Sequence, residues 1–151
     1  MDTQNYLSII NPNAVEVGVP AASKEDVFEY VSQLLKKDGA ITSVEAFKQD
    51  LYAREAMGQT GIGGGVAIPH GKSAAVQRTC ISIVKLAAPI PWESADDKPI
   101  QVVILFAVSL ADKNNSFLRM MAQVARKLAK EGVCSNLIAA TTPQQILQAL
   151  A

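Results

Sequence analysis

The sequence lacks the features that mark several classes of protein. Its 151 residues carry 14 basic and 14 acidic side chains, so no net charge is available to attract nucleic acid or an anionic membrane. No apolar run approaches the roughly 18–20 residues that a membrane-spanning helix needs. The first residues, Met1–Asn5, contain no basic side chain and lead into no apolar segment, so no signal peptide is expected. These absences favour a cytoplasmic protein with no nucleic-acid partner.

Cysteine and histidine are scarce as well. Cys80 and Cys134 occur without a secretory signal, which favours free thiols, buried or half buried, in a reducing compartment. One histidine and no Cys-x-x-Cys pair offer too few ligands for a metal site. The loop Gly61–Val66 lacks the last glycine of the G-x-G-x-x-G nucleotide fingerprint and stands before a strand, and no G-x-x-x-x-G-K-[ST] motif is present. No metal, nucleotide or other cofactor is therefore expected.

Apolar residues are plentiful and suit a single domain with its own core. They make up 49% of the chain. Tyr6–Val19 suggests two short strands around a turn at Asn11–Asn13. Strands are also predicted at Thr79–Leu86 and Ile100–Val108, with a loop at 89–97 between them. Ile100–Val108 is apolar nearly throughout, as a strand buried on both faces would be.

Capping signals predict helices between these strands. Ser23 with Asp26 predicts a helix that runs to Lys36 and Lys37, and Thr42 with Glu45 predicts a second that ends near Gly58. A long helix is expected to begin at Asn114 or Asn115 and to end near Lys130, and a last short one to run from Thr142-Pro143 to Leu150. The apolar stripe of the long helix is predicted to comprise Leu118, Met121, Val124, Ala125 and Leu128. Helices that alternate with strands indicate an α/β fold, a sheet covered by helices.

The single histidine, His70, follows a glycine-rich loop, 58–65, and a predicted short strand, Val66–Ile68. Pro69 has no N–H to donate to a neighbouring strand, so pairing is expected to stop there. Pro69 also stiffens the backbone that leads to His70. The amides of Gly63, Gly64 and Gly65 are not covered by side chains and are candidates to bind an anion. Taken alone, a single histidine is more often structural than catalytic. A glycine-rich stretch taken alone is about as often a flexible turn as a binding loop.

A neutral imidazole near physiological pH has a free lone pair that can attack a phosphoryl group. The other ring nitrogen must then carry the proton, and we expect a carbonyl or carboxylate to hold that tautomer. The phosphorylated ring needs a cation nearby. Arg54, in the helix before the loop, is the candidate, because a guanidinium can bind phosphate oxygens with two donors. The alternative is a solvated arginine beside Glu55.

The run from Arg54-Glu55 through Thr60-Gly61-Ile62-Gly63 to Gly65-Val66-Ala67-Ile68-Pro69-His70-Gly71-Lys72 closely resembles a known signature. It is that of the fructose/mannitol-type enzyme IIA domain of the bacterial phosphoenolpyruvate-dependent sugar phosphotransferase system. The resemblance spans nearly the whole chain and implies one domain, 1–151, with a mixed sheet flanked by helices. It also implies a transferase component phosphorylated on His70, with Arg54 at the phosphorylation site. The histidine would accept phosphoryl from phospho-HPr and pass it to a cysteine of a IIB domain during sugar uptake, and the membrane would be reached only through the IIC permease.

Two positions depart from the family pattern. Phe117 stands where many members have a second histidine, and Gly64 stands where a glutamate or another polar residue is frequent. These departures leave a second interpretation open, in which the chain is a regulatory module of the nitrogen-related branch whose phosphorylation state controls a partner protein. A neighbouring gene for a IIB or IIC component would favour transport, and one for a kinase or transcription factor would favour regulation. A third alternative is a structural domain in which His70 is never phosphorylated.

Overall fold

Strand β6 (Ile100–Ser109) lies at the centre of the molecule, as its apolar sequence predicts. In this computed structural model, which describes residues 5–112 and 115–151, β6 pairs antiparallel with β5 (Cys80–Ile90). Its other edge pairs in parallel with β3 (Val66–Ala67) and then with β4 (His70–Ser73). The outer strands are β1 (Ile10–Val19), parallel to β5, and β2 (Gly61–Gly63), antiparallel to β3. The sheet is therefore mixed and six-stranded, which confirms the predicted fold class.

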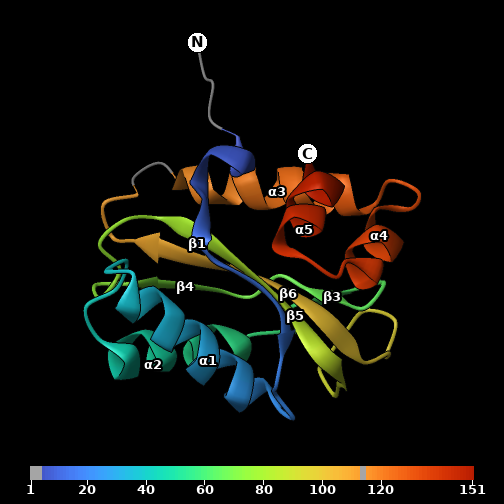
Figure 1. Ribbon diagram of the computed structural model, residues 1–151. Coiled ribbons are helices and arrows are strands. Elements are labelled where there is room, and N and C mark those ends of the chain that lie inside the picture. Colours follow the sequence, from blue (N-terminus) through green and yellow to red (C-terminus); the bar gives the residue numbers. More distant parts are fainter. Residues whose placement is uncertain (1–4, 113–114) are drawn as a thin grey trace.

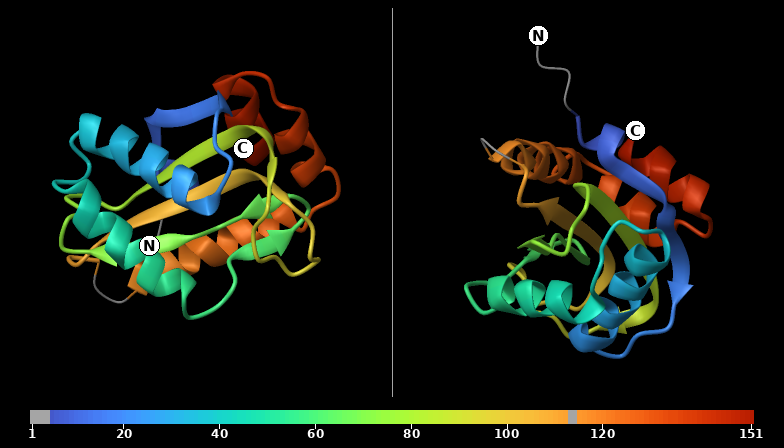
Figure 2. Two further views of the ribbon diagram at one scale, coloured as in Figure 1. Left: turned by 90° about the horizontal axis from the view of Figure 1, so that it is seen from below. Right: turned by 90° about the vertical axis from the view of Figure 1, so that its left-hand side faces the viewer.

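Helices cover both faces of this sheet (Figures 1 and 2). On one face lie α1 (Lys24–Lys37) and α2 (Val44–Glu55), and on the other lie η1 (Tyr6–Ile9), α3 (Ser116–Leu128), α4 (Val133–Ala139) and α5 (Pro143–Leu150). Side chains of β6 alternate between the two cores, so that Leu105 and Ala107 face α1 and α2 while Phe106 faces α3. No helix in the described residues is long and apolar enough to cross a membrane.

Short polar side chains begin the helices on the α1 side, with one shift from the prediction. Ser23 caps α1, and its Oγ accepts a hydrogen bond from the Asp26 N–H at 3.1 Å. The cap of α2 is Ser43, whose Oγ accepts from the Ala46 N–H, so the prediction of Thr42 was wrong by one residue. The Thr42 N–H instead donates to the Ala75 carbonyl at 2.8 Å, a tertiary contact that the local pattern does not reveal.

The long helix α3 also differs from its prediction. The carboxylate of Asp112 accepts from the Phe117 N–H, whereas Asn115 has a φ of 51° and forms no side-chain cap; Asn114 lies outside the described residues. Leu118 is 50% exposed, and the buried stripe consists of Phe117, Met120, Val124 and Leu128. Apolar residues occupy both possible stripes of this helix, so periodicity alone does not choose between them. Packing on the sheet selects the stripe that contains the larger Phe117.

The N-terminal region forms one strand rather than the two predicted. Tyr6–Ile9 is a 3-10 turn, and β1 then continues through Asn11–Asn13 as an irregularity in its pairing with β5. A proline at this point is tolerated because β1 is an edge strand. The side-chain amides of Asn11 and Asn13 donate to the carboxylate of Asp38, just after α1, at 2.7 and 2.9 Å. The polar segment that was interpreted as a turn therefore anchors the strand to a helix.

The glycine-rich segment is a hairpin and not the expected loop. Strands β2 and β3 are joined at Gly64 and Gly65, whose φ angles are 68° and 80°. Positive φ at both positions is what a two-residue turn of the mirror-image type requires, and its twist matches that of the flanking strands. Two further differences are that β5 extends to Ile90, into the loop predicted at 89–97, and that α4 was not predicted.

Candidate functional site

His70 opens β4, directly after a short break in pairing along β6. Ala67 pairs with Val103 before the break, and His70 pairs with Phe106 after it. Pairing is therefore interrupted at Pro69, as expected, but it resumes at the next residue, which was not expected. Proline lacks only the N–H donor, and the Pro69 carbonyl still accepts a hydrogen bond from the Phe106 N–H at 3.0 Å. The backbone of His70 is thus held on the central strand of the sheet.

The His70 ring lies on the α3 side of the sheet. Its centroid is 5.4 Å from that of the Phe117 ring, with the two planes tilted by 49°. The side chain is half buried, and Nδ1 is enclosed without any hydrogen-bond partner among the described residues. The carbonyl or carboxylate that was expected to hold the ring tautomer is not found among the described residues. Since Nδ1 is enclosed, Nε2 is the ring nitrogen that another protein can reach.

The protonation state of His70 follows from its burial. Two causes together lower the pKa of His70 from 6.5 to about 4: loss of solvent on burial, which is the larger, and the positive charge of Arg54. The ring is therefore neutral near pH 7 and has an uncharged nitrogen lone pair. This is the state that the predicted phosphoryl chemistry needs.

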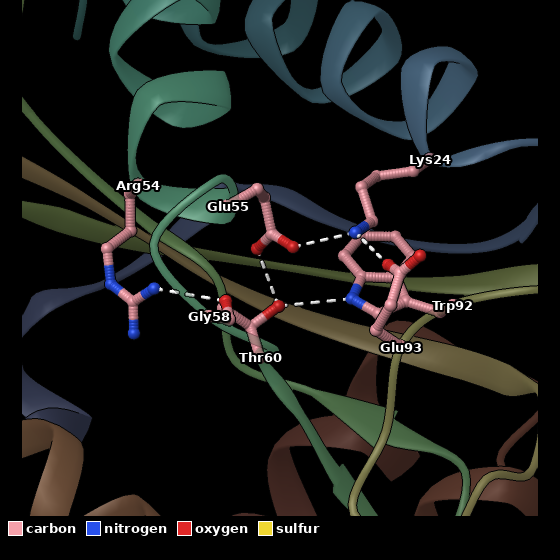
Figure 3. Close-up of polar contacts among 7 residues, drawn as sticks. All are labelled: Lys24, Arg54, Glu55, Gly58, Thr60, Trp92 and Glu93. Carbon is pink, nitrogen blue, oxygen red and sulfur yellow. Dashed lines mark hydrogen bonds and ion pairs between the residues drawn. The ribbon is translucent and has the colours of Figure 1, made fainter.

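Arg54 lies in the last turn of α2, and its charge acts on the His70 ring. Its guanidinium donates to the Gly58 carbonyl at 3.2 Å (Figure 3). It takes part in no ion pair with the described residues, so its other donors are not committed to a carboxylate. The structure thus brings together His70 and Arg54, the two residues selected from the sequence.

A second cation, Lys72, comes from the strand that carries His70. Residues two apart in a strand share a face, so Lys72 follows His70 on the α3 side. Its Nζ is 5.8 Å from the centroid of the Phe117 ring and donates to the Asp112 carbonyl at 3.3 Å. Sequence reasoning did not select Lys72 as a site residue, although its spacing from His70 was the signal that could have identified it.

The three glycines predicted to bind phosphate are not at this site. The Gly63 N–H donates to Ser94 Oγ at 3.2 Å, and the Gly64 N–H donates to the Asp96 carboxylate at 3.1 Å. The Gly65 carbonyl accepts from two amides at the start of β6. The β6 partners of Val66 and His70 are four positions apart in sequence, which amounts to about 13 Å along the strand. The glycines shape the hairpin turn, and the phosphate-binding role expected of them does not fit this geometry.

Exposed apolar side chains lie close to the site in the chain. Among the described residues the large exposed hydrophobic side chains are Leu7, Met57, Leu110 and Leu118. Met57 follows Arg54 by three residues, and Leu118 follows Phe117. Leu110 follows Ser109, which pairs with the last residue of β4. Three of these four side chains are therefore connected to segments that carry the site.

The cysteines are free thiols, as expected, with Cys80 buried and Cys134 half buried. Burial raises the pKa of both thiols, which makes them poor nucleophiles at neutral pH. No three histidine, cysteine or acidic side chains cluster as metal ligands within residues 5–112 and 115–151.

Comparison with known proteins places the chain among relatives of two kinds. Residues 8–151 match the family described as "Phosphoenolpyruvate-dependent sugar phosphotransferase system, EIIA 2". The nitrogen regulatory protein of Escherichia coli is 31% identical over 147 residues, which are 97% of this chain and 89% of that protein. The 2-O-alpha-mannosyl-D-glycerate-specific EIIABC component of the same organism is 29% identical over 97% of this chain. The chain spans only 22% of that longer relative.

Solved structures share the fold. The nitrogen regulatory protein IIA-Ntr of Neisseria meningitidis matches with a TM-score of 0.86 and 24% identity, over 96% of this chain and 98% of that one. Enzyme IIA for mannitol of Escherichia coli, solved in complex with phosphorylated enzyme IIB for mannitol, matches with a TM-score of 0.77 and 22% identity, over 93% and 96% of the two chains.

Proposed function

The chain belongs to the phosphoenolpyruvate-dependent sugar phosphotransferase system EIIA 2 family, and on that premise we propose that it is a phosphoryl carrier whose nucleophile is His70. The observation that carries the proposal is the place of His70 at the start of β4, paired with the central strand and with Nδ1 enclosed, together with the nearby charge of Arg54, which forms no ion pair with the described residues. A carrier needs a nucleophile held in one orientation, because attack on phosphorus must be in line.

The proposed transfer uses Nε2 of His70 with the proton on Nδ1. The Nε2 lone pair forms a bond to phosphorus while the bond between phosphorus and the donor breaks, and the electron pair of that bond stays on the donor. In the second transfer a cysteine thiolate of the acceptor forms a bond to phosphorus. The electrons of the nitrogen–phosphorus bond then return to Nε2, which regenerates the neutral ring.

Arg54 and Lys72 supply the positive charge that the phosphoryl group requires. The guanidinium of Arg54 still has donors that are not bonded to Gly58, and it can meet phosphoryl oxygens with two of them. Lys72 adds a second charge from the same face of β4. Phe117 is apolar and cannot provide the hydrogen bond that a second histidine would, so the two cations carry this role.

The proposed partners are an HPr-like phosphocarrier as donor and a IIB domain as acceptor, in a cytoplasmic sugar-uptake chain that reaches the membrane only through a IIC permease. The mannitol enzyme IIA, which has this fold, was solved with phosphorylated IIB, and this supports a IIB partner. The exposed Met57, Leu110 and Leu118 give both partners an apolar contact surface. Such contacts must be transient, because the carrier releases each partner in turn.

Intact mass after incubation with phosphoenolpyruvate, enzyme I and HPr tests the carrier chemistry. We expect one acid-labile phosphoryl group on the wild-type protein and none on His70→Ala, with both proteins giving the same circular dichroism spectrum. Absence of the adduct on wild type, while the same HPr phosphorylates a known acceptor, would contradict the proposal. An adduct that persists on His70→Ala would assign the phosphoryl group to another residue.

A second candidate role is regulation, in which the phosphorylated and unphosphorylated forms differ in their binding of a target protein. It is favoured by the nitrogen regulatory protein of Escherichia coli, 89% of whose length the chain covers. The phosphorylated protein should be mixed with a panel of purified IIB domains. Transfer to a IIB cysteine would support the uptake chain, whereas retention of the phosphoryl group on His70 with every IIB domain would support regulation.

A further inference from the structure

An ion pair between Lys24 and Glu55 lies largely buried beside Arg54, the residue that precedes Glu55 in α2 (Figure 3). The Glu55 side chain is 7% exposed, and its carboxylate receives two hydrogen bonds. One comes from Lys24 Nζ at 2.7 Å and the other from the Thr60 hydroxyl at 2.6 Å. The Thr60 hydroxyl in turn accepts from the Trp92 indole N–H at 3.0 Å. Hydrogen bonds that each connect two different segments of the chain thus join the side chains of this group, which are Lys24, Glu55, Thr60 and Trp92.

Lys24 completes the group from the first turn of α1. Its Nζ also pairs with Glu93 and lies 4.8 Å from the centroid of the Trp92 ring. The four segments that meet here are the start of α1, the end of α2, the turn before β2 and the segment that follows β5. A buried pair of this kind contributes little net stability, because removing two charges from water offsets most of their attraction. Its main effect is to restrict geometry.

The geometry that it restricts is that of the Arg54 turn. The Glu55 carbonyl accepts from the Gly58 N–H at 3.3 Å, and the Arg54 guanidinium donates to the Gly58 carbonyl. The Thr60 hydroxyl closes the same turn through the Glu55 carboxylate. Both groups that hold Gly58 in place therefore come from adjacent residues of α2. Glu55 is held by the ion pair, and Arg54 carries the charge that lowers the pKa of His70.

We propose that Glu55 is a positioning residue for phosphoryl transfer: anchored by Lys24 and Thr60, it fixes the turn that holds the Arg54 guanidinium beside His70. The proposal rests on the proposed carrier function and extends it to a residue that touches neither the phosphoryl group nor His70. Glu55 acts through Arg54, so its contribution exists only while Arg54 is present.

A double-mutant cycle on the rate of phosphoryl acceptance from phospho-HPr tests this dependence. Glu55→Gln keeps the shape of the side chain, and Lys24 keeps Glu93 as a partner, so the variant is expected to fold. We expect acceptance to slow about 10-fold, within the range typical of residues that act on a catalytic group through another residue. The same substitution should cause no further slowing in an Arg54→Ala background. Equal slowing in both backgrounds, or a wild-type rate in Glu55→Gln, would overturn the proposal.

The matched control is Glu29→Gln. Glu29 pairs with Lys48 at 2.6 Å and joins the same two helices, α1 and α2, without any contact to the Arg54 turn. It should leave the acceptance rate unchanged. Thr60→Val is the second test variant, because it releases the turn while leaving the ion pair intact, and it should slow acceptance in the same direction as Glu55→Gln.

Titration of His70 provides a readout that does not depend on phosphoryl transfer. His70 is the only histidine in the chain, so its ring protons give one resolved NMR titration curve. Loss of the Glu55 charge would by itself lower the pKa of His70, whereas release of Arg54 would raise it. We expect Glu55→Gln and Arg54→Ala both to raise this pKa, and Glu29→Gln to leave it unchanged.

The two proposals fail in different ways. A wild-type protein that accepts phosphoryl, together with a His70 pKa that falls or stays constant in Glu55→Gln, would overturn the positioning role and leave the carrier function standing. A wild-type protein that accepts no phosphoryl would overturn both.

Discussion

Strands β3 and β4 follow each other in the chain and pair with the same edge of β6, but their surroundings differ. In the hairpin that ends in β3, the amides of Gly63 and Gly64 are bonded to Ser94 and Asp96. At the start of β4, the enclosed Nδ1 of His70 has no partner, and neither Arg54 nor Lys72 forms an ion pair with the described residues. The hydrogen-bonded amides of the hairpin serve the structure of the turn. The unpaired groups at the start of β4 can still form bonds to a ligand.

The largest expected effect is that of removing the Arg54 side chain, and it concerns the region of His70 rather than the hairpin. Arg54→Ala removes the positive charge that we propose binds the transferred phosphoryl group, and we expect acceptance to slow about 100-fold, as when one donor to a developing charge is removed. Arg54→Lys should recover part of the rate, because it restores the charge without the two-donor geometry. The measurement is the time course of phosphoryl incorporation by intact mass. A wild-type rate in Arg54→Ala would remove this residue from the mechanism.

The next prediction concerns the hairpin and should change stability without changing chemistry. Gly64 has a φ of 68°, and a Cβ there would lie 2.9 Å from Cys134 Sγ. We expect Gly64→Ala to lower the free energy of unfolding by about 2 kcal/mol, since strain and overpacking act together.

The matched control for this substitution is Gly18→Ala. Gly18 has a φ of 69°, but nothing lies within 4 Å of the position of its Cβ, so only the backbone strain of about 1 kcal/mol should appear. Urea denaturation measures both variants. The acceptance rate of the folded protein should stay at the wild-type value in each, and a rate lowered 10-fold or more by Gly64→Ala would mean that the hairpin does belong to the site.

The smallest effect is the pH dependence of stability at His70. Its pKa is about 4 in the folded protein and near 6.5 in the unfolded chain, so between these values only the unfolded chain binds the proton. The stability contributed by the neutral ring is therefore fully present above pH 6.5 and is lost as the pH falls towards 4. We expect a loss of about 1–2 kcal/mol, a value reduced for the partial solvent exposure of the ring.

Urea denaturation of wild type and His70→Ala at pH 7.5, 5.5 and 4.5 measures this effect. Only the wild-type curve should contain the His70 contribution, so the difference between the two proteins should change over this interval. The acceptance rate should, for the same reason, stay flat between pH 7.5 and 5.5 once changes in the donor are subtracted. A fall in that rate centred near pH 6.5 would show that the ring titrates like one in water.

Local signals in the sequence were sufficient for much of the fold. The apolar run Ile100–Val108 identified the doubly buried strand, and Ser23 and Thr142 marked the starts of α1 and α5. Each of these depends on side-chain spacing along one segment, which the chain determines without reference to other segments. The prediction of His70 and Arg54 likewise came from one continuous run of residues, and the charge of Arg54 lies close enough to His70 to lower its pKa.

Tertiary structure decided what depends on contacts between segments. Ser43 caps α2, while the N–H and the hydroxyl of Thr42 both donate to the Ala75 carbonyl on another segment. Helix α3 buries Phe117 against the sheet and leaves Leu118 exposed. The hairpin glycines Gly63, Gly64 and Gly65 are close to His70 in sequence, but the chain between them runs extended along β6. They therefore lie far from His70 in space. The sequence by itself predicted most of the elements and selected His70 as the proposed nucleophile. Only packing against the sheet decided which groups surround that nucleophile, because burial and charge depend on distances between segments that are remote in the chain.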